Sequence, residues 1–279
     1  MAATLGILAG GGDLPARLID ACRRDGRPLF VIALEGQAEA ERLPADVPQA
    51  WFRMGAAGAI LDRLKAEGVR DIVMAGRVRR PSLSELRPDW KAAQFFARIG
   101  ARALGDDGLL RSVVGLLEQE GFRVVGVQDL TGDLLTPAGT LGRVAPDAAA
   151  LADIDHGIAV ARALGRLDVG QAVVVQQGLV LGVEAIEGTD ALVARCAGLK
   201  RDGAAPVLVK MRKPQQDGRL DLPTFGPETL RGAAAAGFAG IAAEAGGTLL
   251  LARDEVRRLA DAAGLFVVGV TPSDEGKAP

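Results

Sequence analysis

Two lysines and two aspartates lie close together in the stretch VLVKMRKPQQDGRLDLPTFGP (207–227). Lys210 and Lys213 follow an apolar run, and Asp217 and Asp221 come next along the chain. Lysine supplies a point charge that neutralises phosphate oxygens, while carboxylates hold Mg²⁺ together with water and substrate phosphate. These four residues are therefore predicted to be catalytic on a phosphate-containing substrate, with Asp217 and Asp221 as the Mg²⁺ ligands. An ion-paired surface loop would also explain the charges, but it would not explain the rigid frame DLPTFGP.

Three consecutive glycines, Gly10, Gly11 and Gly12, connect an expected strand (4–10) to an expected helix (14–26). Glycine adopts positive φ and lets the backbone approach a ligand closely, and the N-terminus of a helix attracts anions. The spacing matches neither GxGxxG nor GxxxxGK[ST], which argues against a dinucleotide site or a P-loop. We expect this loop to contact the substrate, and a tight strand–helix turn is the alternative.

A group of arginines follows the apolar run DIVMAG, which ends at Gly76. Arg77, Arg79 and Arg80 would lie at the C-terminal end of a strand, which is the edge at which doubly wound sheets bind ligands. Their guanidinium groups suit phosphate oxygens. Arg111, one turn into a later helix, could reach the same rim. All five residues are predicted to bind substrate, and a solvated basic loop is the alternative.

The stretch VLGVEAIEGTDALVAR contains a second group of acidic residues. Glu184 is expected at the end of a strand, and Thr189 and Asp190 are expected at the start of a helix. An apolar strand that ends in an acid can aim the carboxylate into a cleft, whereas Thr189 or Asp190 could instead be a helix N-cap. The residues leave both interpretations open. Together with Thr224 of DLPTFGP, these three residues are predicted to bind substrate.

Alternating apolar runs and helical patterns in the first half predict βαβ units around a parallel sheet. The runs are continuously apolar, as expected of strands that are covered on both faces. In the second half, QAVVVQQGLVLGV is expected to form two strands that turn near Gln177 and Gly178. The chain is therefore expected to be an α/β protein with a Rossmann-like parallel-sheet N-terminal domain (1–132), a linker (133–146) and a mixed α/β C-terminal catalytic domain (147–272).

The composition argues against several classes of function. The 279 residues carry a formal net charge of −2, whereas nucleic-acid binding requires a basic surface. His156 is the single histidine, so a His-rich dinuclear centre is not expected, and in a hydrolase carboxylates and lysines would have to carry the chemistry. Cys22 and Cys196 have no CxxC partner and indicate neither a disulfide framework nor a zinc site. Since no signal peptide and no membrane-spanning apolar run is visible, a cytoplasmic protein is expected.

Six sequence blocks in a fixed order make the chain resemble a known enzyme family over nearly its whole length. It resembles the UDP-2,3-diacylglucosamine pyrophosphatase of lipid A biosynthesis, of the two-domain type that is unrelated to the calcineurin-like enzyme. The blocks are GILAGGGDLP, GRVRRPSL, GDDGLLRSVVGLLEQEGFRVVG, VLGVEAIEGTD, VLVKMRKPQQDGRLDLPTFGPETL and GFAGIAAEAGGTLLL.

The resemblance implies Mg²⁺-dependent hydrolysis of UDP-2,3-diacylglucosamine to UMP and 2,3-diacylglucosamine 1-phosphate (lipid X), with water attacking the β-phosphorus. It also implies two domains that close on the substrate and a hydrophobic chamber for the acyl chains. Asp221 matches a catalytic acidic position of the family, and Phe225 stands where an aliphatic residue is expected. Five further residues fall in matching blocks: Asp217, Lys210, Lys213, Glu184 and Asp190.

The implied partner is a lipid-linked UDP-sugar, so transient contact with the cytoplasmic face of the inner membrane is expected, and the apolar content permits a homodimer. Two other functions compete with this interpretation. An NAD-dependent oxidoreductase would be expected to carry the motif GxGxxG, followed by an acidic residue at the end of the second strand. Glu35 could serve as that acidic residue, but the glycines of this chain do not have the spacing of the motif. A non-catalytic nucleotide-sugar or lipid sensor would keep the glycine loop, but it would not need the lysines and aspartates.

Overall fold

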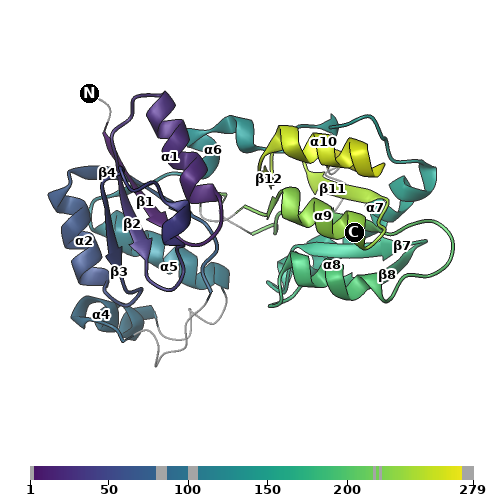
Figure 1. The fold of residues 1–279 in the computed structure, drawn as a ribbon. Helices are drawn as coiled ribbons and strands as arrows, with labels where there is room; N and C mark the ends of the chain where they lie inside the picture. The colour runs from purple at the N-terminus through teal and green to yellow at the C-terminus, as the bar shows by residue number, and fades with distance from the viewer. Residues whose placement is uncertain (1–2, 80–86, 100–105, 216–217, 220–221, 272–279) are drawn as a thin grey trace. The chain divides into compact units, whose positions relative to one another are not determined.

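The computed structural model describes residues 3–79, 87–99, 106–215, 218–219 and 222–271, and Figure 1 shows its helices and strands. The chain divides into two compact units. Unit 1 comprises Met1–Asp133 and Asp217–Asp221, and unit 2 comprises Leu134–Gln216 and Leu222–Pro279. Each unit packs helices on a sheet, which confirms the predicted α/β class. No helix within the described ranges is long and apolar enough to cross a membrane.

Unit 1 is built on a parallel five-stranded sheet in the order β3-β2-β1-β4-β5. This order equals that of the first five strands of a doubly wound sheet, and the alternating apolar runs predict a sheet of this type. The strands are β1 (Thr4–Ala9), β2 (Leu29–Leu34), β3 (Gln49–Phe52), β4 (Val69–Ala75) and β5 (Arg123–Val124).

The helices of unit 1 cover both faces of this sheet, with α1 and α2 on opposite sides (Figure 1). Leu61 of α2 and Val114 of α5 join Phe30 and Ile72 of the strands in one buried cluster. The helical segments are α1 (Leu14–Arg24), α2 (Ala57–Ala66), α4 (Trp90–Ile99), α5 (Asp106–Gln119) and the short α6 (Val127–Leu130), with 3₁₀ turns η1 (Ala40–Arg42) and η3 (Gly132–Leu134).

A buried carboxylate ties two strands of unit 1 together. Asp71 of β4 accepts hydrogen bonds from Arg123 Nε and Nη2 of β5, both at 2.8 Å, and from Arg27 Nη2 at 2.5 Å. Hydrogen bonding to Arg123 in the first place, with the charge of Arg27 added, lowers the pKa of Asp71. Because this folded-state pKa lies below the unfolded-state value, the ionised carboxylate stabilises the fold at neutral pH.

We therefore expect Asp71→Asn to lower the free energy of unfolding of unit 1 by about 2 kcal/mol at neutral pH, since it removes a buried charge partner from two arginines. The stabilisation by Asp71 is lost as the pH falls through its lowered pKa, so the difference between wild type and variant should shrink in acid. Urea unfolding curves recorded from neutral to acidic pH measure this difference. Asp46→Asn is the control, because the exposed Asp46–Arg23 pair should contribute much less. A constant difference at all pH values would contradict the prediction.

Unit 2 is built on a six-stranded mixed sheet in the order β6-β13-β11-β9-β7-β8. Strands β9, β11 and β13 are parallel, and β7 is antiparallel to both of its neighbours, β8 and β9. Strands β8, β9, β11 and β13 therefore all end at the same edge of the sheet. The strands are β6 (Gly139–Thr140), β7 (Ala172–Gln176), β8 (Leu179–Val183), β9 (Val207–Lys210), β11 (Gly240–Glu244) and β13 (Phe266–Val270).

The stretch 133–146, expected to be a linker, contributes to this sheet. Strand β6 pairs antiparallel with β13, and the Leu141 N–H donates to the Val267 carbonyl at 2.8 Å. A short second sheet joins β10 (Thr224–Phe225) to β12 (Leu249–Leu250) in parallel.

Helices also cover both faces of the sheet of unit 2. Ile154 and Ala161 of α7 pack with Val173 and Val209 on one face. On the other face, α8, α9 and α10 contribute a separate cluster that includes Leu192, Leu230 and Val256. The helices are α7 (Ala148–Arg166), α8 (Thr189–Ala197), α9 (Pro227–Ala235) and α10 (Arg253–Ala263).

Strands β7 and β8 form the predicted hairpin. Gln177 and Gly178 make its two-residue turn, with φ of 52° and 75°, as a type I′ turn requires. Both backbone N–H groups donate to the carboxylate of Asp153 on α7, at 2.8 and 2.7 Å. The buried Asp153 therefore fixes the hairpin to the helix that covers it.

Candidate functional site

Charged side chains lie in unit 2 where three strands of its sheet, β8, β9 and β11, end. Glu184 follows β8, Lys210 ends β9 and Glu244 ends β11, so the strand directions place all three at one sheet edge. Lys210 is only 3% exposed and Glu184 only 6%. A buried charge requires partners, because isolation from water would otherwise favour its neutral form. The contacts of these residues therefore indicate what the edge can do.

Lys210 and Glu184 are joined through the hydroxyl of Thr189, the first residue of α8. Lys210 Nζ donates to Thr189 Oγ1 at 2.5 Å, and Thr189 Oγ1 donates to Glu184 Oε1 at 2.5 Å. The other oxygen, Glu184 Oε2, accepts the backbone N–H of Gln171 at 3.1 Å. Three residues predicted to lie in the site are thus in direct contact, and Thr189 is not an N-cap, since Gly188 holds that position.

Lys213 lies just beyond the same strand and pairs with a residue that the sequence did not single out. Its Nζ is 2.6 Å from Asp168 Oδ1, and both side chains are largely buried. Asp168 has a left-handed backbone conformation (φ 57°) directly after α7. Gly165 allows this approach, because a Cβ there would lie 3.2 Å from the Lys213 Cα. The end of α7 therefore orients the second predicted phosphate-binding lysine.

Glu244 is a further acid that the sequence analysis missed. Its Oε2 accepts the backbone N–H of Arg212 at 3.0 Å, which links the end of β11 to the chain leaving β9. The signal that could have found it is its position, since an acid at the end of a central parallel strand lies at the ligand-binding edge.

Two further predicted substrate-binding residues, Asp190 and Thr224, make hydrogen bonds within unit 2. Asp190 Oδ1 accepts the hydroxyl of Thr229, on α9, at 3.0 Å. Thr224 is partly buried, and its hydroxyl donates to the Leu222 carbonyl at 3.0 Å. The Asp190 contact joins the first turns of α8 and α9.

The two predicted Mg²⁺ ligands, Asp217 and Asp221, lie outside the described residues, as does Arg80. Among the residues that the structure does describe, no three acidic, histidine or cysteine side chains form a group that could hold a metal ion. Mg²⁺ is bound in many enzymes by one or two carboxylates together with water and substrate phosphates. The pair of aspartates fits that donor set, and the metal site stays a prediction.

In unit 1, the glycine loop and the arginine-rich segment lie against each other. Gly11 and Arg77 exchange backbone hydrogen bonds in both directions, each at 2.8 Å. A Cβ on Gly10 would lie 2.5 Å from the Arg77 carbonyl oxygen, and one on Gly76 would lie 2.6 Å from that of Gly11. The close crossing of two backbone segments therefore requires glycine at these positions, a cause that neither the ligand hypothesis nor the tight-turn alternative named, and substrate contact stays a prediction.

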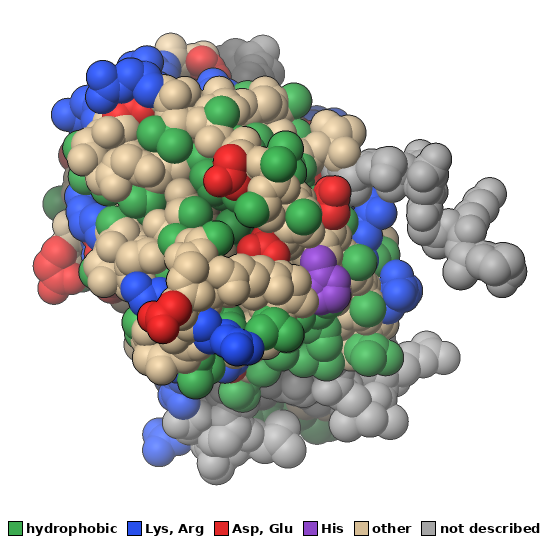
Figure 2. Space-filling model, turned by 90° about the vertical axis from the view of Figure 1, so that its right-hand side faces the viewer, with side chains coloured by type: hydrophobic (Ala, Val, Ile, Leu, Met, Phe, Trp, Pro, Cys, Tyr) green, Lys and Arg blue, Asp and Glu red, His purple; other side chains and the backbone are tan. Residues whose placement is uncertain are grey.

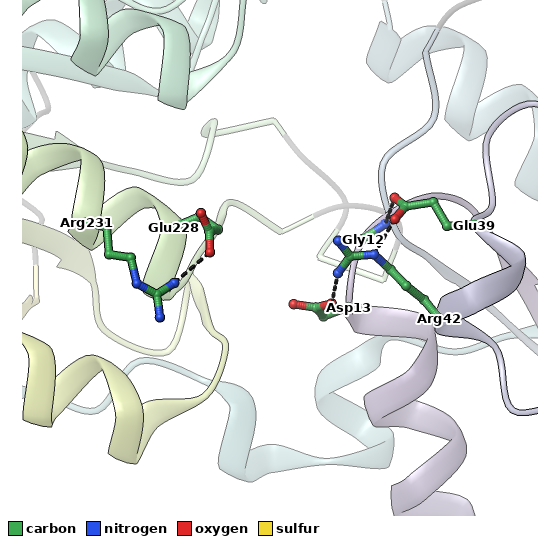
Figure 3. A network of polar contacts seen from close by, with 6 residues as sticks. All are labelled: Gly12, Asp13, Glu39, Arg42, Glu228 and Arg231. Atoms are coloured by element: carbon green, nitrogen blue, oxygen red, sulfur yellow. Dashed lines mark hydrogen bonds and ion pairs between the residues drawn. The ribbon is translucent and has the colours of Figure 1, made fainter.

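The same loop holds an ion cluster that the sequence did not indicate (Figure 3). The Gly12 N–H donates to Glu39 Oε1 at 3.2 Å, and Arg42 pairs with both Glu39 and Asp13. The hydrogen bond from Arg42, followed by that from Gly12, lowers the pKa of Glu39. The chain that follows β2 therefore supplies a carboxylate to the N-terminal end of α1.

The predicted arginines of unit 1 differ in their surroundings. Arg77 and Arg79 are exposed, and the Arg79 N–H donates to Gln37 Oε1 at 2.8 Å. Arg111 is exposed on α5. All three side chains are exposed, and a phosphate-binding role for them stays a prediction.

A family model described as the LpxI N-terminal domain matches residues 4–134, and one described as the LpxI C-terminal domain matches residues 137–268. The UDP-2,3-diacylglucosamine pyrophosphatase LpxI of Caulobacter vibrioides (strain ATCC 19089 / CIP 103742 / CB 15) is 44% identical over 280 residues, covering 97% of this chain and 98% of that protein.

Similar solved structures include CobK precorrin-6A reductase, with a TM-score of 0.33 and 15% identity over 98% of this chain and 90% of that one. Another is the UDP-glucose 4-epimerase of Thermus thermophilus in complex with NAD, with a TM-score of 0.32 and 12% identity over 97% of this chain and 87% of that one. The two family models together, and the curated relative by itself, match almost the whole sequence, and the chain belongs to the LpxI family.

Proposed function

We propose that this protein hydrolyses the pyrophosphate bond of UDP-2,3-diacylglucosamine in lipid A biosynthesis, releasing UMP and 2,3-diacylglucosamine 1-phosphate. The observation that carries the proposal is the 44% identity, over 97% of the chain, to a relative named for this pyrophosphatase activity. The buried Lys210 at a strand end supports it, because a fixed cation suits a diphosphate group.

In the proposed reaction, a water oxygen bonds to the β-phosphorus, on the sugar side, and the bridging P–O bond breaks. The electron pair of that bond stays on the bridging oxygen, which leaves with UMP. Lys210 and Lys213 neutralise the charge on the diphosphate oxygens, and Asp221 accepts the proton of the attacking water or orients it. Phosphoryl transfer depends mainly on such positioning and charge stabilisation, with little covalent chemistry by the protein.

Mg²⁺ is part of this proposal, with Asp217 and Asp221 as the residues that would hold it. A bound Mg²⁺ would supply positive charge to the diphosphate oxygens. The two carboxylates would in addition keep the attacking water close to the phosphorus.

The acyl chains of the substrate lead us to propose transient contact with the cytoplasmic face of the inner membrane. Three exposed apolar side chains of unit 2 suit such contact: Ile186, two residues after Glu184, and Leu167 and Val169, on either side of Asp168. Figure 2 shows one face of the molecule, on which hydrophobic side chains lie among charged ones.

Hydrolysis in ¹⁸O-labelled water tests the proposal. Purified protein with UDP-2,3-diacylglucosamine and Mg²⁺ should release UMP, and mass spectrometry should find the label in the sugar phosphate and not in UMP. EDTA should stop the reaction, and added Mg²⁺ should restore it. Label in UMP would place the attack on the α-phosphorus. Binding without UMP release would support the sensor alternative. If the protein neither binds the substrate nor releases UMP, both the pyrophosphatase and the sensor hypotheses are contradicted.

A further inference from the structure

The hydrogen bonds around Lys210 have a fixed direction. An ammonium group donates only, so the Thr189 oxygen must accept from Lys210 Nζ. The single hydrogen of the Thr189 hydroxyl is then directed to Glu184 Oε1. The hydroxyl therefore links a buried cation to a buried anion.

Local backbone features hold the acidic end of this chain in place. Gly188, with φ 81°, turns the chain between Glu184 and Thr189 so that α8 begins at Thr189. Gly170 lets the start of β7 pass against the backbone carbonyl of Glu184, where any Cβ would clash. This approach delivers the Gln171 N–H to Glu184 Oε2. Both carboxylate oxygens of Glu184 are thus engaged within unit 2.

We propose that Thr189 and Glu184 are positioning residues that act through Lys210, and that neither contacts the substrate. Thr189 fixes the position of the ammonium group through one hydrogen bond, and Glu184 compensates the buried charge through the Thr189 hydroxyl. The inference rests on the proposed function and assigns these two residues a different role from direct substrate binding.

The test compares Thr189→Val, which keeps the shape but removes the hydroxyl, with Thr189→Ser, which keeps the hydroxyl. We expect Thr189→Val to lower kcat about 10- to 100-fold, as loss of a group that orients a functional residue does, with KM changed less than about threefold. Thr189→Ser should stay within about threefold of wild type. Thr248→Val is the matched control, because Thr248 is fully buried in the same unit and its hydroxyl has no hydrogen-bond partner among the described residues.

The outcomes separate this inference from the proposed function. If wild type releases no UMP, the proposed function fails. If wild type is active but Thr189→Val stays fully active, or if Ser and Val lose activity equally, only the positioning role is overturned. If Thr189→Val does not fold, Glu184→Gln tests the same role. We expect Glu184→Gln to lower kcat about as much as is expected for Thr189→Val, with KM nearly unchanged. Full activity of Glu184→Gln would overturn the positioning role. A rise in KM alone would indicate that these residues bind the substrate directly.

Discussion

Replacing Asp221 with alanine is expected to lower kcat/KM for UMP release at least about a hundredfold, which equals about 3 kcal/mol of transition-state stabilisation. The physical reason is that the carboxylate either orients the attacking water or holds the Mg²⁺ that neutralises the diphosphate. The measurement is UMP release by the purified variant at several substrate concentrations. Circular dichroism and thermal unfolding must show that the variant is folded.

A Mg²⁺ titration distinguishes the two roles of Asp221. If Asp221 is a metal ligand, Asp221→Ala should raise the Mg²⁺ concentration that gives half-maximal activity, and Asp217→Ala should do the same. If Asp221 is instead the base, Asp221→Ala should leave the Mg²⁺ requirement unchanged and lower kcat at saturating Mg²⁺. Asp254→Ala, which removes an exposed carboxylate from α10, is the control and should be fully active. A folded and fully active Asp221→Ala would make DLPTFGP a structural turn, and the reaction would have to be sought around Glu184.

The main elements of the fold could be predicted from the sequence because their patterns are strong. Continuous apolar runs identify β1, β2 and β4 as buried parallel strands. The turn at Gln177 and Gly178 follows from the two apolar runs beside it. Strand β3 gives no such signal, because its residues QAWF lie at the sheet edge with partly exposed side chains. Strand β6 is also beyond sequence reasoning, since only pairing with β13 makes its two residues a strand.

Part of the charged cluster of unit 2 could be predicted, where residue type and position along a strand coincide in the sequence. Lys210 ends an apolar run and Glu184 follows one, and strand direction alone brings both to one edge. Asp168 and Gln171 could not be found in this way, because the return of the chain after α7 places them beside Lys213 and Glu184. No sequence pattern encodes that return.

The glycine loop shows the limit of reasoning from residue type. Three glycines suggest that a ligand approaches the backbone closely, but a second backbone segment that passes close by also requires residues without a Cβ. Gly10 and Gly76 lie where that segment crosses, and the Gly11–Arg77 bonds close the crossing. The motif alone cannot tell the two causes apart, because either one excludes a Cβ.

Lys210→Met is expected to lower kcat/KM about a thousandfold, about 4 kcal/mol, because it removes a fixed charge where negative charge develops on the diphosphate. The variant should also be less stable, by about 2–3 kcal/mol, since the Glu184 charge stays buried without its cation. Reduced stability alone could lower the measured activity, so the single variant does not separate the two effects. A second substitution, at Glu184, does.

The double variant Lys210→Met with Glu184→Gln removes both charges and keeps both side-chain sizes. Its midpoint of thermal unfolding should return toward that of wild type, because no buried charge is left without a partner. Its activity should stay as low as that of Lys210→Met, since the ammonium group is still absent. Recovery of activity together with stability would mean that Lys210 serves the fold and not the reaction. Recovery of stability alone would show that the lysine has two roles, one in holding the end of β9 in the resting protein and one in the proposed reaction.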